Sequence, residues 1–128
     1  MSMMNKEDKE LLLQDLCARL PYGVICKDDY AKIEGKLSQI GINYDMCVLS
    51  DVYGKTEWAY IPNCKPYLFP LSSMTEEQER EIVSITYSNH NDMVIASLTI
   101  DWLNKNHFDY RGLIENGLAL DATGLNIY

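Results

Sequence analysis

The chain changes from extended backbone to helix within Lys65-Pro-Tyr-Leu-Phe-Pro-Leu-Ser-Ser-Met-Thr-Glu-Glu-Gln-Glu-Arg-Glu-Ile82. Pro66 and Pro70 confine the first part of this stretch to extended conformations, because a proline ring fixes φ and removes a backbone N–H. Thr75 and Gln78 then stand at the spacing of a capping box, beside glutamates that suit the positive end of a helix dipole. The stretch predicts a boundary between a β-rich part and a helical part.

A helix is expected at the N-terminal end, over residues 5–20. Asn5 is a suitable N-cap, and acidic residues follow it in the first turn. The helix carries an apolar stripe at helical spacing, made of Leu12, Leu13, Leu16, Cys17 and Leu20. Pro21 ends it. Residues 1–3, which precede a second possible start at Met4, are interpreted as a cloning remnant.

Short antiparallel strands are expected over residues 22–71. Apolar and polar residues alternate from Ala31 to Ser38, which is typical of a half-buried strand. Further apolar runs follow at Met46–Leu49 and Thr56–Ile61, separated by turn-forming residues. Such strands can bury one face by forming a small antiparallel barrel or a meander. The pair Ile33–Leu37 and Met46–Leu49 looks like the central hairpin of SH3-like and Sm-like barrels.

The C-terminal part is expected to be helical over residues 75–117. Asp92 is a candidate N-cap for a second helix. The apolar residues of that helix recur at helical spacing and predict a core helix; they are Val94, Ile95, Leu98, Trp102 and Leu103. The chain is therefore predicted to be a single α+β domain over residues 1–128, with an N-terminal helix, a small β-barrel or meander and a C-terminal helical segment.

The composition limits the classes of partner. Eleven basic and nineteen acidic residues give a net charge of −8, which opposes binding to a nucleic-acid backbone. The charged N-terminal segment predicts neither a signal peptide nor a membrane span, so a cytoplasmic protein is expected. The cysteines form no C-x-x-C pair and are expected to be reduced, buried thiols. No metal site and no cofactor are predicted.

The densest group of potential acid, base and anion-binding side chains is His107, Asp109, Tyr110 and Arg111. In an extended segment, Asp109 would orient the imidazole of His107 as a general base, and Arg111 would hold a carboxylate or phosphate. The alternative is structural: Asp109 caps a turn, and Tyr110 anchors the segment to the core. The structural interpretation is favoured, and His107 with Asp109 stays an alternative catalytic pair.

Two further groups are candidates for ligand binding. Trp58 and Tyr60 fall on the same face of a strand and could stack on a base, although large residues also fill the interior of a small barrel. Ser72, Ser73 and Thr75 precede a helix, whose free N–H groups attract anions. The neighbouring glutamates repel anions, so capping is the simpler role for these hydroxyls.

Two runs in the C-terminal half carry a resemblance. Lys65-Pro-Tyr-Leu-Phe-Pro-Leu-Ser-Ser-Met-Thr-Glu-Glu77, together with Asp101-Trp-Leu103 and His107-Phe-Asp-Tyr-Arg-Gly-Leu-Ile114, resembles short uncharacterised proteins of phages and integrated elements of gut bacteria. The resemblance implies a small accessory protein directed against host machinery. It identifies no functional residue.

The leading hypothesis is a non-enzymatic binding protein that sequesters a host nucleotide-type signal or blocks a host protein. A nucleotide would be held by Trp58 and Tyr60, the hydroxyls before the helix, and Tyr110 and Arg111, at the interface of a homodimer or higher homo-oligomer. The alternatives are a small hydrolase that uses His107, and an SH3-like or Sm-like module that binds a peptide or, against the charge, nucleic acid.

Overall fold

The computed structural model describes residues 4–128, so the interpretation of residues 1–3 as a cloning remnant lies outside the described residues. Its helices are α1 (Lys6–Arg19), α2 (Glu76–Thr86) and α3 (Asp92–Lys105), with short 3-10 helices η1 (Leu20–Tyr22), η2 (Ile42–Tyr44), η3 (Ile61–Asn63) and η4 (Leu71–Ser73). Its strands are β1 (Ile25–Asp28), β2 (Ile33–Gly41), β3 (Met46–Ser50), β4 (Thr56–Tyr60), β5 (Cys64–Pro70), β6 (Phe108–Asp109) and β7 (Leu120–Asp121). The predicted α+β class is confirmed.

The strands form one open, mixed sheet with the order β4-β3-β2-β1-β5-β6, and β7 also pairs with β5. Strands β1 to β4 form an antiparallel meander, because each pairs with the next along the chain. By contrast, β6 and β7 run parallel to β5. The path begins at β4 and ends at β6, so the SH3-like or Sm-like barrel is not confirmed. The meander, the other predicted form, is what the first strands adopt.

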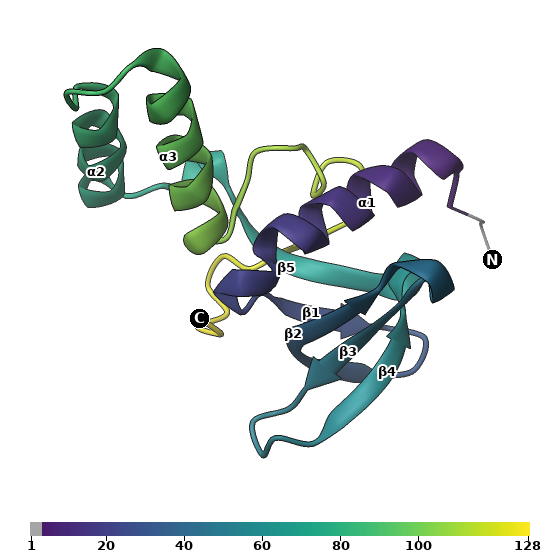
Figure 1. Ribbon diagram of the computed structural model, residues 1–128. Coiled ribbons are helices and arrows are strands. Elements are labelled where there is room, and N and C mark those ends of the chain that lie inside the picture. Colours follow the sequence, from purple (N-terminus) through teal and green to yellow (C-terminus); the bar gives the residue numbers. More distant parts are fainter. Residues whose placement is uncertain (1–3) are drawn as a thin grey trace.

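Helix α1 lies across one face of the sheet (Figure 1). It begins where expected, since the Asn5 side chain accepts a hydrogen bond from the backbone N–H of Asp8 at 2.7 Å. Its buried side is narrower and more polar than the predicted stripe, and consists of Leu12, Asp15, Leu16 and Arg19. Cys17, which was placed on that stripe, is exposed.

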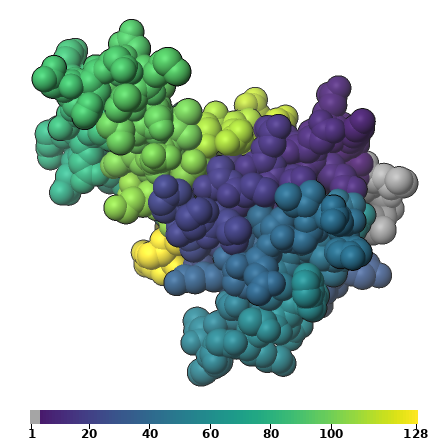
Figure 2. Space-filling model, viewed as in Figure 1, coloured from purple at the N-terminus to yellow at the C-terminus, as the bar shows by residue number. Residues whose placement is uncertain are grey.

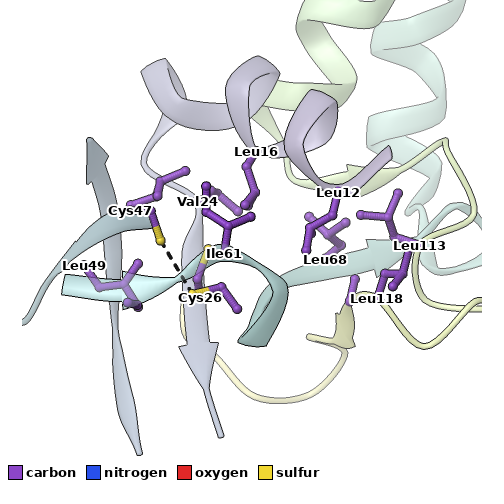
Figure 3. Packing of buried hydrophobic residues seen from close by; sticks show 14 residues of the cluster. Leu12, Leu16, Val24, Cys26, Cys47, Leu49, Ile61, Leu68, Leu113 and Leu118 are labelled. Atoms are coloured by element: carbon purple, nitrogen blue, oxygen red, sulfur yellow. Dashed lines mark hydrogen bonds between the residues drawn. The ribbon is translucent and has the colours of Figure 1, made fainter. Parts of the chain in front are cut away.

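The core lies between α1 and the sheet. Leu12 and Leu16 point from α1 toward Val24, Ile61 and Leu68 on the opposite side (Figure 3). The buried cluster is Leu12, Leu16, Val24, Cys26, Leu37, Cys47, Leu49, Ala59, Ile61, Cys64, Leu68, Leu113, Leu118 and Ala119. Members from the N-terminal helix, the meander and the C-terminal loop therefore share one core, and burying their apolar area drives the folding of this part.

Helices α2 and α3 form a helical hairpin that projects from the rest of the molecule (Figures 1 and 2). The predicted capping box is present, since Thr75 and Gln78 exchange side-chain-to-backbone hydrogen bonds. The N-cap of α3 is Asn91 rather than Asp92. The prediction of a core helix is wrong, because only Leu103 and Asn104 of α3 are buried. Trp102 stacks on Phe108 of β6 near the C-terminal end of α3, whereas Val94 and Leu98, farther from the sheet, stay more than a third exposed.

The C-terminal residues return to the sheet. The Tyr128 hydroxyl donates a hydrogen bond to the carbonyl oxygen of Tyr67 at 2.7 Å and accepts one from the N–H of Ile25 at 2.9 Å. The short strand β7 pairs with β5 just before this end of the chain. These contacts hold the end of the chain against β1 and β5.

Candidate functional site

A buried ion cluster joins α1 to the segment that follows α3. Asp15 and Arg19 are fully buried, and the Arg19 Nε donates a hydrogen bond to the Asp15 Oδ2 at 2.8 Å. The Arg19 Nη2 donates another to the carbonyl oxygen of Phe108 at 2.6 Å. On its other side, the Asp15 Oδ1 lies 3.4 Å from the Arg111 Nε. One buried carboxylate therefore serves two guanidinium groups.

Tyr110 lies between the same two arginines. The guanidinium carbons of Arg19 and Arg111 are 5.4 and 5.0 Å from the centre of its ring, within the range of cation–π attraction. Its hydroxyl donates to the Asn104 Oδ1 at 2.9 Å and accepts from the Arg111 Nη2 at 3.1 Å. The structure thus brings Tyr110 and Arg111 together, but it commits both of them to neighbours inside the protein.

Asp109 accepts hydrogen bonds from the backbone N–H groups of Arg111, Leu113 and Ile114, at 3.3, 3.0 and 2.9 Å. This carboxylate closes the turn after β6, which is the structural role foreseen for it. Among the described residues, no hydrogen bond links it to the imidazole of His107. With both oxygens occupied by backbone donors, Asp109 is poorly placed to orient a catalytic base.

His107 is buried, with its ring stacked on that of Tyr128 at 3.7 Å between centres. Its φ of 63° is left-handed, a conformation that is uncommon for residues other than glycine and that asparagine, aspartate and histidine adopt more often than most. Burial, and then the nearby Arg19 cation, lower the pKa of His107 from 6.5 to about 4. At neutral pH the imidazole is uncharged and a weak base.

The lowered pKa of His107 predicts a specific dependence of stability on pH. Unfolding exposes the imidazole, which then takes up a proton below pH 6.5, so stability should fall between pH 6.5 and about 4 and level off below that. His107→Asn keeps a residue that tolerates the left-handed backbone but does not titrate. We expect the difference in free energy of unfolding between the two proteins, measured with urea, to narrow as the pH falls. A difference in free energy of unfolding that stays constant with pH would contradict the lowered pKa of His107.

Trp58 and Tyr60 lie on β4, at one edge of the sheet, and their side chains are 61% and 44% exposed. Ala59 between them points into the core. The two aromatic side chains are therefore exposed to solvent rather than filling an interior, and Tyr60 shares a depression with the N-terminal end of α1.

The hydroxyls before α2 are mostly engaged locally. The Ser73 hydroxyl donates to the carbonyl oxygen of Pro70 at 2.7 Å, and the Thr75 hydroxyl accepts the N–H of Gln78 at 3.2 Å. Ser72 lies beside them in η4. This segment and β4 lie at opposite ends of the molecule (Figure 1). The structure consequently does not assemble the three predicted groups into one pocket within a chain.

Three of the four cysteines are buried, namely Cys26, Cys47 and Cys64. Sequence spacing did not reveal that the sulfur atoms of Cys47 and Cys64 lie 3.5 Å apart in the core. Their hydrogen bond lowers the pKa of Cys47 and raises that of Cys64. Within residues 4–128, no three His, Cys, Asp or Glu side chains gather in an arrangement that could bind a metal ion. None of the helices described has the length and apolarity needed to cross a membrane.

The feature that sequence reasoning missed is the surface of the helical hairpin. Six large apolar side chains on it are exposed, by 37% to 84%: Val83, Tyr87, Met93, Val94, Leu98 and Ile100, here called the α2–α3 surface. A shallow depression on the outer side of α2 is lined by Glu76, Glu79, Arg80, Val83, Ser84 and Tyr87. From Glu76 to Lys105 there are six acidic and two basic residues, a net charge of −4. The surface is both apolar and acidic.

Comparison of the chain with models of protein families, with curated proteins and with solved structures found no match. Function is therefore argued from the geometry above. The potential acid–base and anion-binding side chains are occupied by structural contacts, whereas apolar side chains stand exposed on the helical hairpin.

Proposed function

We propose that this chain is a non-enzymatic binding protein that contacts a protein partner through the α2–α3 surface. The observation that carries the proposal is the exposure of six apolar side chains on two helices that project from the body. Val83 and Tyr87 line the same depression on α2, and an exposed apolar patch commonly marks a site of protein interaction. Tyrosine and methionine, both present here, are favoured residues of interface cores.

The charge of the helical hairpin points to the chemistry of the partner. Glu76 and Glu79 line the same depression as Val83 and Tyr87, and the hairpin as a whole has a net charge of −4, so a partner segment that carries apolar residues on one side and lysine or arginine at the margins would match both properties. A basic amphipathic helix has this composition and would lie along a helical surface through its apolar side. The resemblance to phage-encoded proteins supports a host protein as the partner that is blocked.

The nucleotide and hydrolase hypotheses receive less support. A nucleotide pocket made from the predicted residues would need β4 and the start of α2 to meet, and they lie at opposite ends of the molecule. A hydrolase would need His107 as an accessible base, whereas its imidazole is buried and has a pKa of about 4. Neither alternative explains the exposed helices.

The test uses a synthetic amphipathic helix built from leucine and lysine, titrated into the protein by calorimetry. We expect binding that weakens as salt is added, and no binding of the same peptide with glutamate in place of lysine. Tyr87→Ser combined with Val83→Ser should weaken binding by at least about tenfold, because buried aromatic anchors dominate interface energies. Tyr30→Ser is the matched control, since Tyr30 is 78% exposed in the turn between β1 and β2. Equal affinity for the lysine and glutamate peptides would argue against the α2–α3 surface as the binding site. So would an equal loss of affinity in the Tyr87/Val83 variant and in the Tyr30 control.

A further inference from the structure

The edge strand β4 has a free side. It pairs with β3 on one side only, and the path of the sheet begins there. The Ile61 N–H donates to the carbonyl oxygen of Asp45 at 2.8 Å, and the Asp51 N–H donates to that of Lys55 at 2.9 Å. These two bonds fix which positions of the ladder are hydrogen-bonded pairs.

Hydrogen-bonded positions alternate along an antiparallel ladder. Since residues 55 and 61 bond toward β3, residues 57 and 59 do so as well. Thr56 and Trp58 therefore direct their backbone N–H and C=O groups away from the sheet, and Tyr60 directs its N–H the same way. Unpaired groups on an edge strand are a template for pairing with another strand.

Two of the residues with outward backbone groups also expose large aromatic side chains. Trp58 is 61% exposed and Tyr60 is 44% exposed. Natural edge strands usually carry charges, prolines or bulges that prevent pairing; β4 carries one charge, Glu57, next to its exposed tryptophan, and no proline. The edge therefore combines free hydrogen-bonding groups with apolar area that pairing would bury.

We propose that β4 pairs with β4 of a second copy of the chain, antiparallel, about a two-fold axis at Trp58. The outward groups are symmetric about that residue, so Trp58 meets Trp58 of the second copy and the Tyr60 N–H meets the carbonyl oxygen of Thr56. On the other face, Glu57 comes opposite Ala59 of the second copy, so no two like charges stand directly opposite each other, and the two Glu57 side chains are diagonal neighbours. Aromatic residues that face each other across strands add to the stability of such a pair.

This register gives the interface an unusual salt dependence. Each chain carries a net charge of −8, so two copies repel each other at long range, and the two Glu57 side chains, diagonal to each other at β4, add to that repulsion. Added salt screens the repulsion and leaves the hydrogen bonds and aromatic contacts largely intact. The dimer should therefore become tighter as salt is added, whereas a dimer held by ion pairs would weaken.

Sedimentation equilibrium tests the proposal. The wild-type protein should show a doubling of mass with rising concentration, at lower concentration when salt is added. Trp58→Pro removes an N–H that β3 does not use, and proline is tolerated on edge strands, so this variant should fold and stay monomeric. Trp58→Ala keeps the N–H and should weaken the dimer by about tenfold or more. Tyr30→Ala, in the exposed turn between β1 and β2 and outside the paired strands, should dimerise like the wild type.

A cross-link tests the register even if Trp58→Pro fails to fold. In an antiparallel hydrogen-bonded pair the Cα atoms lie about 5.5 Å apart, within the span of a disulfide. With the exposed Cys17 changed to serine, Trp58→Cys should give a covalent dimer when the diamide reagent oxidises the two thiols to one disulfide. Lys55→Cys in the same background should not, because position 55 comes opposite position 61. A wild-type monomer at every concentration, or equal cross-linking at both positions, would overturn the proposal.

Discussion

Replacing Arg19 with methionine should lower the free energy of unfolding by about 3–5 kcal/mol, because it leaves a buried carboxylate without its closest cation. Asp15 and Arg19 are both fully buried, and the hydrogen bond between them is 2.8 Å long. The variant also removes the donor to the carbonyl oxygen of Phe108. Urea denaturation followed by circular dichroism measures the loss, and a fall of this size is a large fraction of the stability of a small domain.

Two controls separate the buried charge from the loss of a large side chain. The double variant Asp15→Leu with Arg19→Met should recover most of the stability, since well-packed apolar pairs can replace buried ion pairs at little cost. Arg80→Met, on the exposed side of α2, should change the free energy by less than about 0.5 kcal/mol. If Arg19→Met behaves like Arg80→Met, or if the double variant is no better than the single one, the cluster does not hold the fold together.

The cluster also explains the composition of the run from His107 to Ile114. Arg19 reaches 89 residues along the chain to bond Phe108, and Asp15 lies 3.4 Å from Arg111. The charged residues of this run thus dock the C-terminal segment on α1. Side chains that resemble an active site in the sequence act here as structural contacts.

The sequence predicted the elements whose signals are local. Asn5 caps α1, and Thr75 with Gln78 caps α2, because a capping hydrogen bond needs only residues three apart. The parallel part of the sheet could not be predicted in this way. The parallel partners of β5 are two-residue strands from beyond α3, and such short segments carry no periodic pattern.

Burial was harder to predict than helicity. The apolar stripe of α3 correctly indicated a helix, but an amphipathic pattern does not say what covers the stripe, and Val94 and Leu98 stayed more than a third exposed. For Asp15 and Arg19 the error is the opposite one, because their sequence pattern indicates exposure and both side chains are buried. Oppositely charged residues four apart are usually a solvated pair on a helix surface, and only the packing of the C-terminal segment over α1 buries them.

Substituting Gly35 with alanine should destabilise the protein by about 3 kcal/mol, at the upper end of the usual cost of overpacking. A Cβ atom at this position would lie 2.4 Å from the carbonyl oxygen of Ser50, and backbone cannot move aside as a flexible side chain can. Gly35 is not among the glycines with positive φ, so the cost is one of space and not of conformation. Gly41→Ala is the matched control in the same strand, since its Cβ would meet the nearest backbone atom, the Met46 carbonyl oxygen, at 3.5 Å, which is an ordinary contact. We expect that control to stay within about 1 kcal/mol of the wild type in thermal or urea unfolding. Similar values for both variants would mean that β2 and β3 can separate at Ser50, and that the close approach at Gly35 does not fix their register.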